Sequence, residues 1–151
     1  MENFITIKEN VIAEITEKKS KFIANLIKVE NKQDAEEKIN KIKKTYHDAR
    51  HNCVAYRIIE ENKIIEKSSD DGEPSGTAGG PMLNILQKNN LCNILVIVTR
   101  YFGGILLGTG GLTRAYTKGA SIALKAGGVV EKVQGVDVAL HLDYDMIGKV
   151  Q

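Results

Sequence analysis

The stretch that decides the fold is ILVIVTRYFGGILLGTGGLTRAYTKGASIALKAGG, residues 94–128. Ile94–Val98 contains only β-branched residues and leucine, as expected of a central strand that is covered on both faces. The strand leads through a glycine-rich loop into a helix that Gly127 and Gly128 end. The apolar stripe of this helix comprises Leu112, Ala115, Gly119, Ile122, Ala123 and Ala126. Its small residues predict a helix lying close against a sheet.

The flanking segments add further strands and helices. Alternating patterns predict two strands within Val11–Val29, a hairpin over residues 54–65 and a strand at Val136–Leu142. Helical spacing predicts an amphipathic helix over residues 31–43, capped by Asn31 or Asp34, and a short helix that begins at Pro81. The predicted order is β-β-α-β-β-α-β-α-β. This order indicates an α+β fold, a two-layer sandwich of a mostly antiparallel sheet with helices on one face.

Length and composition bound the class of protein. The chain has 151 residues, 42% of them hydrophobic, and this predicts one main domain at residues 1–143. A net charge of only +2 indicates no polyanion partner by itself, although it leaves room for a local basic face. The two cysteines, Cys53 and Cys92, form no C-x-x-C pair, which favours a reducing cytoplasm. No segment has the roughly 20 apolar residues that cross a bilayer, so we expect neither export nor a membrane partner.

The glycine-rich loop is the first candidate site. Where such a loop opens directly into a helix, unpaired backbone amides and the helix dipole favour an anion. The candidate anion or nucleic-acid ligands are Arg100, Tyr101, Gly103, Gly104, Gly108, Thr109, Gly110, Gly111, Thr113 and Arg114. The sequence matches neither the Walker nor the dinucleotide-binding pattern. The alternative is that the glycines only allow close helix packing, with Tyr101 and Tyr116 at the edge of the core.

A polar loop over residues 68–81 is the second candidate. Its crowded carboxylates need a positive partner, which is magnesium, an arginine such as Arg57, Arg100 or Arg114, or the amides of a helix N-terminus. With two nearby histidines it defines a candidate polar pocket of His47, His51, Asp70, Asp71, Glu73, Ser75 and Thr77. The alternative is a polar turn in which Asp70 and Asp71 accept backbone hydrogen bonds.

The segment His47–Cys53 is the third candidate. His47 and His51 are four residues apart, so they either share a helical face and bind a metal ion or hydrogen-bond a helix-to-strand junction. Cys53 is either a nucleophilic thiol or a buried structural cysteine, and its place at a strand start favours the second. No metal site and no catalytic residue is assigned.

These three segments together resemble the YigZ/IMPACT family. The matching stretches are His47 to Tyr56, the run DDGEPSGTAG at residues 70–79 and the block from Arg100 to Tyr116, in this order. The resemblance covers residues 20–128, and residues 144–151 resemble the start of the ferredoxin-like second domain of bacterial members. It implies a fold of the ribosomal small-subunit protein domain 2-like or GHMP kinase type. It also implies a link to translation and stress control, with nucleic acid as the suspected ligand of bacterial members.

Three functions follow from these observations. The first is a non-catalytic RNA- or ribosome-associated module that holds phosphate at the glycine loop and stacks bases on Tyr101 or Tyr116. The second is a small phosphoryl-transfer or hydrolytic enzyme that uses the acidic loop and magnesium. The third is a protein-interaction domain. We expect the histidines, the acidic loop and the glycine loop to line one depression.

Overall fold

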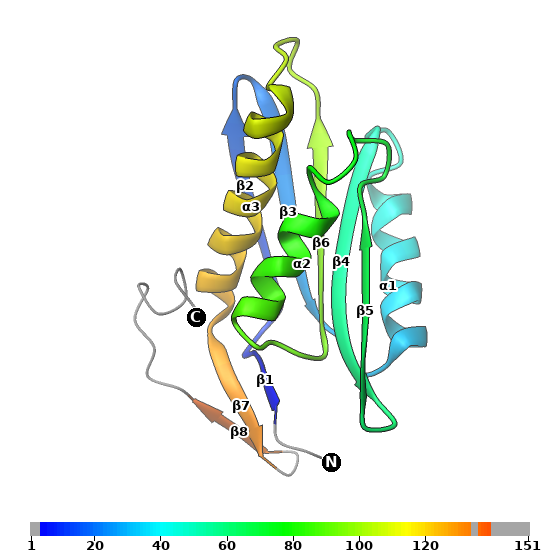
Figure 1. Ribbon diagram of the computed structural model, residues 1–151, viewed down its shortest axis with the longest axis vertical. Helices are drawn as coiled ribbons and strands as arrows, with labels where there is room; N and C mark the ends of the chain where they lie inside the picture. Colours follow the sequence, from blue (N-terminus) through cyan, green and yellow to red (C-terminus); the bar gives the residue numbers. More distant parts are fainter. Residues whose placement is uncertain (1–3, 134–135, 140–151) are drawn as a thin grey trace.

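Two antiparallel sheets and three helices make up the computed structural model, which describes residues 4–133 and 136–139. The elements are, in chain order, β1 (Phe4–Ile7), β2 (Val11–Glu17), β3 (Ser20–Lys28), α1 (Lys32–Thr45), β4 (His51–Glu60), β5 (Lys63–Ser69), α2 (Gly79–Lys88), β6 (Ile94–Tyr101), α3 (Gly108–Gly127), β7 (Val129–Val133) and β8 (Val136–Ala139). The larger sheet has the strand order β2-β3-β6-β4-β5, and the smaller has the order β1-β7-β8 (Figure 1). The α+β class and the antiparallel pairing agree with the sequence.

The prediction of helices on one face of the sheet is wrong. Alternate residues of β4 enter two separate cores: Cys53 and Ala55 pack with α2 and α3, whereas Val54 and Tyr56 pack with α1. Figure 1 shows α2 and α3 side by side over the front of the sheet, while α1 lies beyond β4 and β5. The physical reason is that β4 and β6 are apolar at consecutive positions, so both of their faces require a cover.

The local signals for the helices are confirmed. Asn31 caps α1, because its side chain accepts a hydrogen bond of 2.8 Å from the backbone N–H of Asp34. The small residues of α3 bring the helix close to the sheet: a Cβ on Gly119 would lie 4.0 Å from the side chains of Ala24 and Val98. Gly128 then ends α3 with a φ of +71°.

Two short strands, β1 and β7, were not predicted. They pair with each other, with Ile7 opposite Val129, and so bring the start of the described chain next to the end of α3. The predicted last strand is confirmed over Val136–Ala139, which pairs with β7. Its continuation to Leu142, and residues 144–151, lie outside the described residues.

The register of the central strands creates the candidate site. Arg100, near the end of β6, lies opposite both Phe22 of β3 and His51 of β4. The glycine-rich loop after β6 therefore meets the β2–β3 turn and the first residues of β4 at one end of the larger sheet (Figure 1). Within residues 4–133 and 136–139, no helix has the length and apolar character required to span a membrane.

Candidate functional site

A buried ion pair joins the acidic loop to the central strand. The Glu73 side chain is only 1% exposed, and it accepts two hydrogen bonds from Arg100, 2.6 Å from Nε and 2.9 Å from Nη2. The hydroxyl of Tyr116 on α3 donates a third hydrogen bond of 2.5 Å to the same carboxylate. Burial pushes the pKa of Glu73 up, but the hydrogen bonds from Arg100 and Tyr116 and the charge of Arg100 outweigh it and lower the pKa. Glu73 is therefore a carboxylate that connects the loop, β6 and α3.

His51 and Cys53 at the start of β4 complete this cluster. His51 Nδ1 lies 2.9 Å from the backbone carbonyl of Asp71, and since a carbonyl only accepts, Nδ1 carries the hydrogen. Its Nε2 lies 3.7 Å from Glu73 Oε1. The Cys53 thiol donates to the carbonyl of Asp70 at 3.1 Å, and burial raises its pKa to about 12. Cys53 is thus a protonated, buried thiol, which fits the structural alternative rather than a nucleophile.

The two aspartates of the loop bind backbone amides. The Asp70 carboxylate accepts hydrogen bonds from the N–H groups of Gly76, Ala78 and Gly79, at 2.8, 3.1 and 2.8 Å, and so caps the start of α2. Asp71 accepts a hydrogen bond of 2.7 Å from the N–H of Asn52. Both therefore act as in the polar-turn alternative.

The predicted polar pocket is only partly assembled. His51 and Glu73 lie together, whereas Thr77 donates its hydroxyl to the carbonyl of Pro74 at 2.6 Å and Ser75 is exposed. His47 is exposed in the turn after α1, and β4 begins at His51, so the two histidines do not share a helical face as the metal hypothesis required. No group of three or more His, Cys, Asp or Glu in the described chain is arranged to hold a metal ion.

The glycines of the second loop have different functions. Gly103 is required by packing, because a Cβ there would lie 1.9 Å from the carbonyl oxygen of Lys19. Gly104 and Gly108 have φ values of +91° and +75° and face open space. Gly110 lies within α3 and has no positive φ. Gly103 thus allows the loop to pack against the β2–β3 turn, and Gly104 and Gly108 shape the turn into α3.

The first turn of α3 opens onto a basic groove. Its N-cap, Leu107, provides no side-chain hydrogen bond to the amides of the turn. A cavity of about 300 Å³ beside it is lined by Glu17, Lys18, Leu107, Gly111, Arg114, Ala115 and Lys118. Lys118 pairs with Glu17 at 3.0 Å, while Arg114 makes no ion pair with any described residue. Thr113 is not part of this lining, and its hydroxyl donates to the carbonyl of Thr109.

A second cavity includes the Arg100 side chain in its lining. It has a volume of about 400 Å³ and is lined by Asp48, Arg50, His51, Arg100, Tyr101 and Phe102. The Tyr101 hydroxyl donates a 2.7 Å hydrogen bond to Asp48, whereas Phe102 is 53% exposed. Tyr116 is fully buried, so the prediction that it stacks on a base is wrong.

Sequence reasoning missed three basic residues that line these two cavities. Lys18 and Lys118 line the groove beside α3, and Arg50 lines the second cavity. The neighbouring Lys18 and Lys19 form a positive-φ turn between two predicted strands, and that turn is a signal that could have located Lys18.

Comparison with known proteins identifies the family of this α+β domain. The family model described as Impact N-terminal domain matches residues 18–124. IMPACT family member YvyE of Bacillus subtilis is 48% identical over 151 residues, which are 100% of this chain and 69% of the relative. IMPACT family member YigZ of Escherichia coli is 37% identical over 93% of this chain and 69% of its own length. The chain therefore belongs to the IMPACT family, and the resemblance seen in the sequence is confirmed.

A solved structure has a similar fold. A crystal structure described as that of a hypothetical protein superposes with a TM-score of 0.80 at 38% identity. The match covers 88% of this chain and 65% of the solved one.

Proposed function

We propose that this chain is a non-catalytic module that binds single-stranded RNA, free or within the ribosome, and acts in translation or stress regulation. Its phosphate site is the basic groove at the first turn of α3. The fold and the family support this proposal, although neither of them specifies a biochemical activity. The resemblance of the sequence to a family linked to translation and stress control, and to the ribosomal small-subunit protein domain 2-like fold, is consistent with it.

The observation that carries the proposal is the environment of Arg114. This exposed arginine follows the uncapped amides of the α3 first turn and lines a cavity of about 300 Å³ together with Lys18 and Lys118. Amides of a helix N-terminus and a guanidinium without a carboxylate partner both favour a phosphate. Gly104 and Gly108 leave the approach to the helix open, because a Cβ on either would meet nothing within 4 Å.

Exposed apolar side chains of the loop before α3 provide the surface for bases. Phe102 is 53% exposed and Leu106 is 83% exposed, and both belong to the loop between β6 and α3. Bases of a single strand stack on exposed aromatic rings without sequence preference. Phe102 therefore replaces Tyr116 as the stacking residue in this proposal, while Tyr101 keeps its ring beside Lys21, 5.9 Å from the Lys21 Nζ atom.

The sequence offered Arg100 both as an anion ligand and as a positive partner of the acidic loop, and we propose the second of these functions. Two of its nitrogens bind Glu73, so we assign it to holding the acidic loop against β6 rather than to the main phosphate contact. Arg114 and the unpaired amides of Gly108, Thr109 and Gly110 take that part.

The enzyme alternative has no comparable observation in its favour. Asp70, Asp71 and Glu73 already accept hydrogen bonds from protein donors, and the pKa of the Cys53 thiol is about 12. The chemistry of magnesium would require these carboxylates to leave their present partners. If the test below finds no RNA binding, a protein partner becomes the favoured alternative.

The test is a fluorescence-anisotropy titration of a labelled oligouridine with wild type, Arg114→Ala and the control Lys63→Ala. Lys63 is an equally exposed cation, but it begins β5 at the opposite end of the sheet from Arg100. Arg114→Ala should weaken binding by about 1–3 kcal/mol, the range for hydrogen bonds to charged groups, and lower the salt slope by about 0.7. Lys63→Ala should bind as wild type does. Absence of wild-type binding at low salt, or equal losses in both variants, would reject the proposal.

A further inference from the structure

A separate cavity lies at the other end of the central strands. It has a volume of about 560 Å³ and is lined by Phe4, Thr6, Lys28, Val29, Glu30, Asp34, Lys38 and Asn93. Lys28 ends β3 and Asn93 precedes β6, whereas the glycine loop lies by Ser20 and follows Tyr101, at the opposite ends of the same strands. At about 3.3 Å per residue, the two sites are about 25 Å apart. This cavity is therefore independent of the proposed RNA site.

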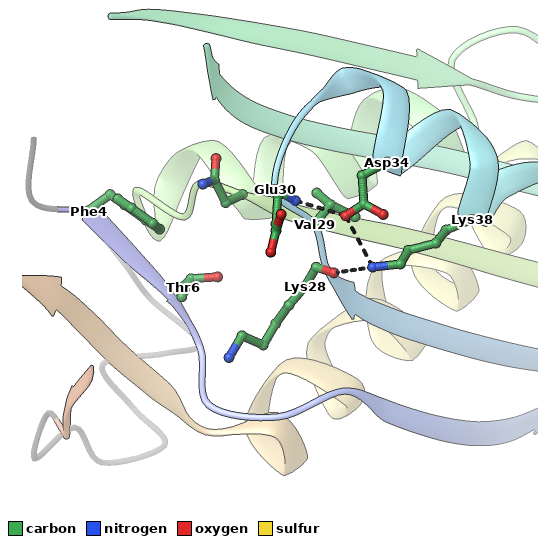
Figure 2. Close-up of a pocket in the computed structure, with 8 residues that line it drawn as sticks. Phe4, Thr6, Lys28, Val29, Glu30, Asp34 and Lys38 are labelled. Atoms are coloured by element: carbon green, nitrogen blue, oxygen red, sulfur yellow. Dashed lines mark hydrogen bonds and ion pairs between the residues drawn. The ribbon is translucent and has the colours of Figure 1, made fainter. Parts of the chain in front are cut away.

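Thr6 contributes a polar atom that lacks a partner. Its side chain is buried, with the residue 1% exposed, and Oγ1 makes no hydrogen bond within the described residues. Figure 2 shows the Thr6 hydroxyl pointing from β1 into the space beside the side chains of Lys28 and Glu30. A buried hydroxyl is normally hydrogen-bonded. A ligand that enters this space would supply the hydrogen-bond partner that the Thr6 hydroxyl lacks.

Two opposite charges in the cavity also have no ion-pair partner among the described residues. No described residue forms an ion pair or a hydrogen bond with the carboxylate of Glu30. The Lys28 ammonium has no carboxylate of a described residue within 4.0 Å, and its hydrogen bond to the carbonyl of Lys8 is long, at 3.5 Å. Figure 2 shows both side chains extending into the same space without meeting.

The other charged pair of the cavity is already satisfied. Lys38 Nζ lies 3.1 Å from Asp34 Oδ2 and 3.1 Å from the carbonyl of Lys28. The same Asp34 oxygen accepts a hydrogen bond of 2.9 Å from the N–H of Glu30. These contacts fix the backbone that carries Lys28 and Glu30, so the two unpaired charges are held on a rigid support.

The charges select the class of ligand. The lining holds two cations and two carboxylates, so a phosphate would meet the repulsion of Glu30 and Asp34, and a simple cation that of Lys28 and Lys38. A ligand that carries an ammonium and a carboxylate pairs with Glu30 and Lys28 at once. Phe4 and Val29 add apolar walls, and the volume far exceeds the roughly 30 Å³ of one water.

We propose that this cavity binds a small zwitterion of the α-amino acid class with an apolar side chain. Glu30 pairs with its ammonium group, Lys28 pairs with its carboxylate, and the Thr6 hydroxyl hydrogen-bonds the carboxylate. Phe4 and Val29 contact the side chain. The site lies where β1, β3 and α1 converge, so an occupied cavity ties the smaller sheet to the larger one.

The test is a calorimetric and NMR titration of the full chain with L-leucine and two analogues. The amine 3-methylbutan-1-amine lacks the carboxylate, and 4-methylpentanoate lacks the ammonium. L-leucine should bind saturably and shift the amide resonances of Thr6, Lys28 and Glu30, and each analogue should bind at least about tenfold weaker, the loss of one charged hydrogen bond.

Three variants connect the binding to the named groups. Glu30→Gln should weaken L-leucine about tenfold and leave 4-methylpentanoate unchanged, whereas Lys28→Met should weaken L-leucine and leave the amine unchanged. Thr6→Val removes a hydroxyl that has no protein partner, so it should weaken L-leucine without lowering stability. Glu14→Gln, an exposed change on β2, is the control. The proposal is overturned if neither L-leucine nor L-phenylalanine binds at about 10 mM, if the analogues bind equally, or if all variants behave as wild type.

Discussion

Glu73 and Arg100, 27 residues apart in the chain, form a bidentate ion pair in which the glutamate side chain is 1% exposed. The pair ties the acidic loop to the central strand, and Tyr116 adds α3 to the same carboxylate. The two loops that were candidate sites in the sequence are thus connected by one buried group. We therefore expect the shapes of both loops to depend on the Glu73 carboxylate.

Replacing Glu73 by glutamine should destabilise the chain by about 3–5 kcal/mol, because it leaves the buried Arg100 charge without its partner. Urea unfolding followed by circular dichroism measures the difference. Glu14→Gln changes an exposed carboxylate on β2 and should stay within about 0.5 kcal/mol of wild type. A similar small loss for both variants would mean that the pair contributes no net stability.

The contribution of this pair should also depend on pH. Since the folded-state pKa of Glu73 lies below its ordinary value of 4.5, the stabilisation is complete above that pH and lost as pH falls through the folded-state pKa. The difference in unfolding free energy between wild type and Glu73→Gln should be constant near neutral pH and shrink in acid. A difference that grows on acidification would contradict the assignment.

Tyr116→Phe isolates the third hydrogen bond of the cluster. The phenyl ring keeps the edge-to-face contact with Phe22, at a centroid distance of 5.2 Å, and loses only the hydroxyl. We expect a loss of about 1.5–3 kcal/mol in unfolding free energy, as for a hydrogen bond to a charged group. Tyr101→Phe removes a hydroxyl whose acceptor, Asp48, is exposed, and it should cost less than about 1 kcal/mol. Equal costs would show that burial of the acceptor is irrelevant.

Gly103 and Gly80 offer a matched pair of glycine substitutions. Gly103→Ala should destabilise by about 1–3 kcal/mol, because the new Cβ would lie 1.9 Å from the Lys19 carbonyl oxygen and the β2–β3 turn must move. Gly80→Ala lies in α2 with open space around it and should stabilise by about 0.5–1 kcal/mol. Thermal unfolding of both variants checks the opposite signs.

The sequence predicted the elements better than their arrangement. The hairpin of β4 and β5, the cap at Asn31 and the strand–loop–helix unit of β6 and α3 all rest on local patterns, and they are present. The sequence did contain evidence against placing all helices on one face. The apolar run Ile94–Val98 already indicated that both faces of the sheet are covered, and α1 covers the second face. The four-residue β1 and five-residue β7 carry too short a pattern to be read without their partner.

The candidate site was harder to predict, because its residues meet through loops. The pairing of Arg100 with Glu73 depends on the path of the acidic loop, which is set by Asp70 binding three amides around the start of α2. No periodicity encodes that path. In the sequence, Arg100 and Arg114 were both candidates for a phosphate contact and for pairing with the acidic loop, and only the fold separates the two.

The most direct test of the RNA proposal is an amide ¹H–¹⁵N NMR titration of the full chain with a short oligouridine at low salt. The resonances of Thr109, Gly110, Gly111 and Arg114 should shift together along one saturation curve, and they should return when salt is raised, because phosphate contacts weaken with ionic strength. Resonances of the β4–β5 turn at Glu61 and Asn62, at the opposite end of the sheet, should not move. Saturable shifts confined to that turn, or no shifts at the start of α3, would contradict a phosphate site at α3.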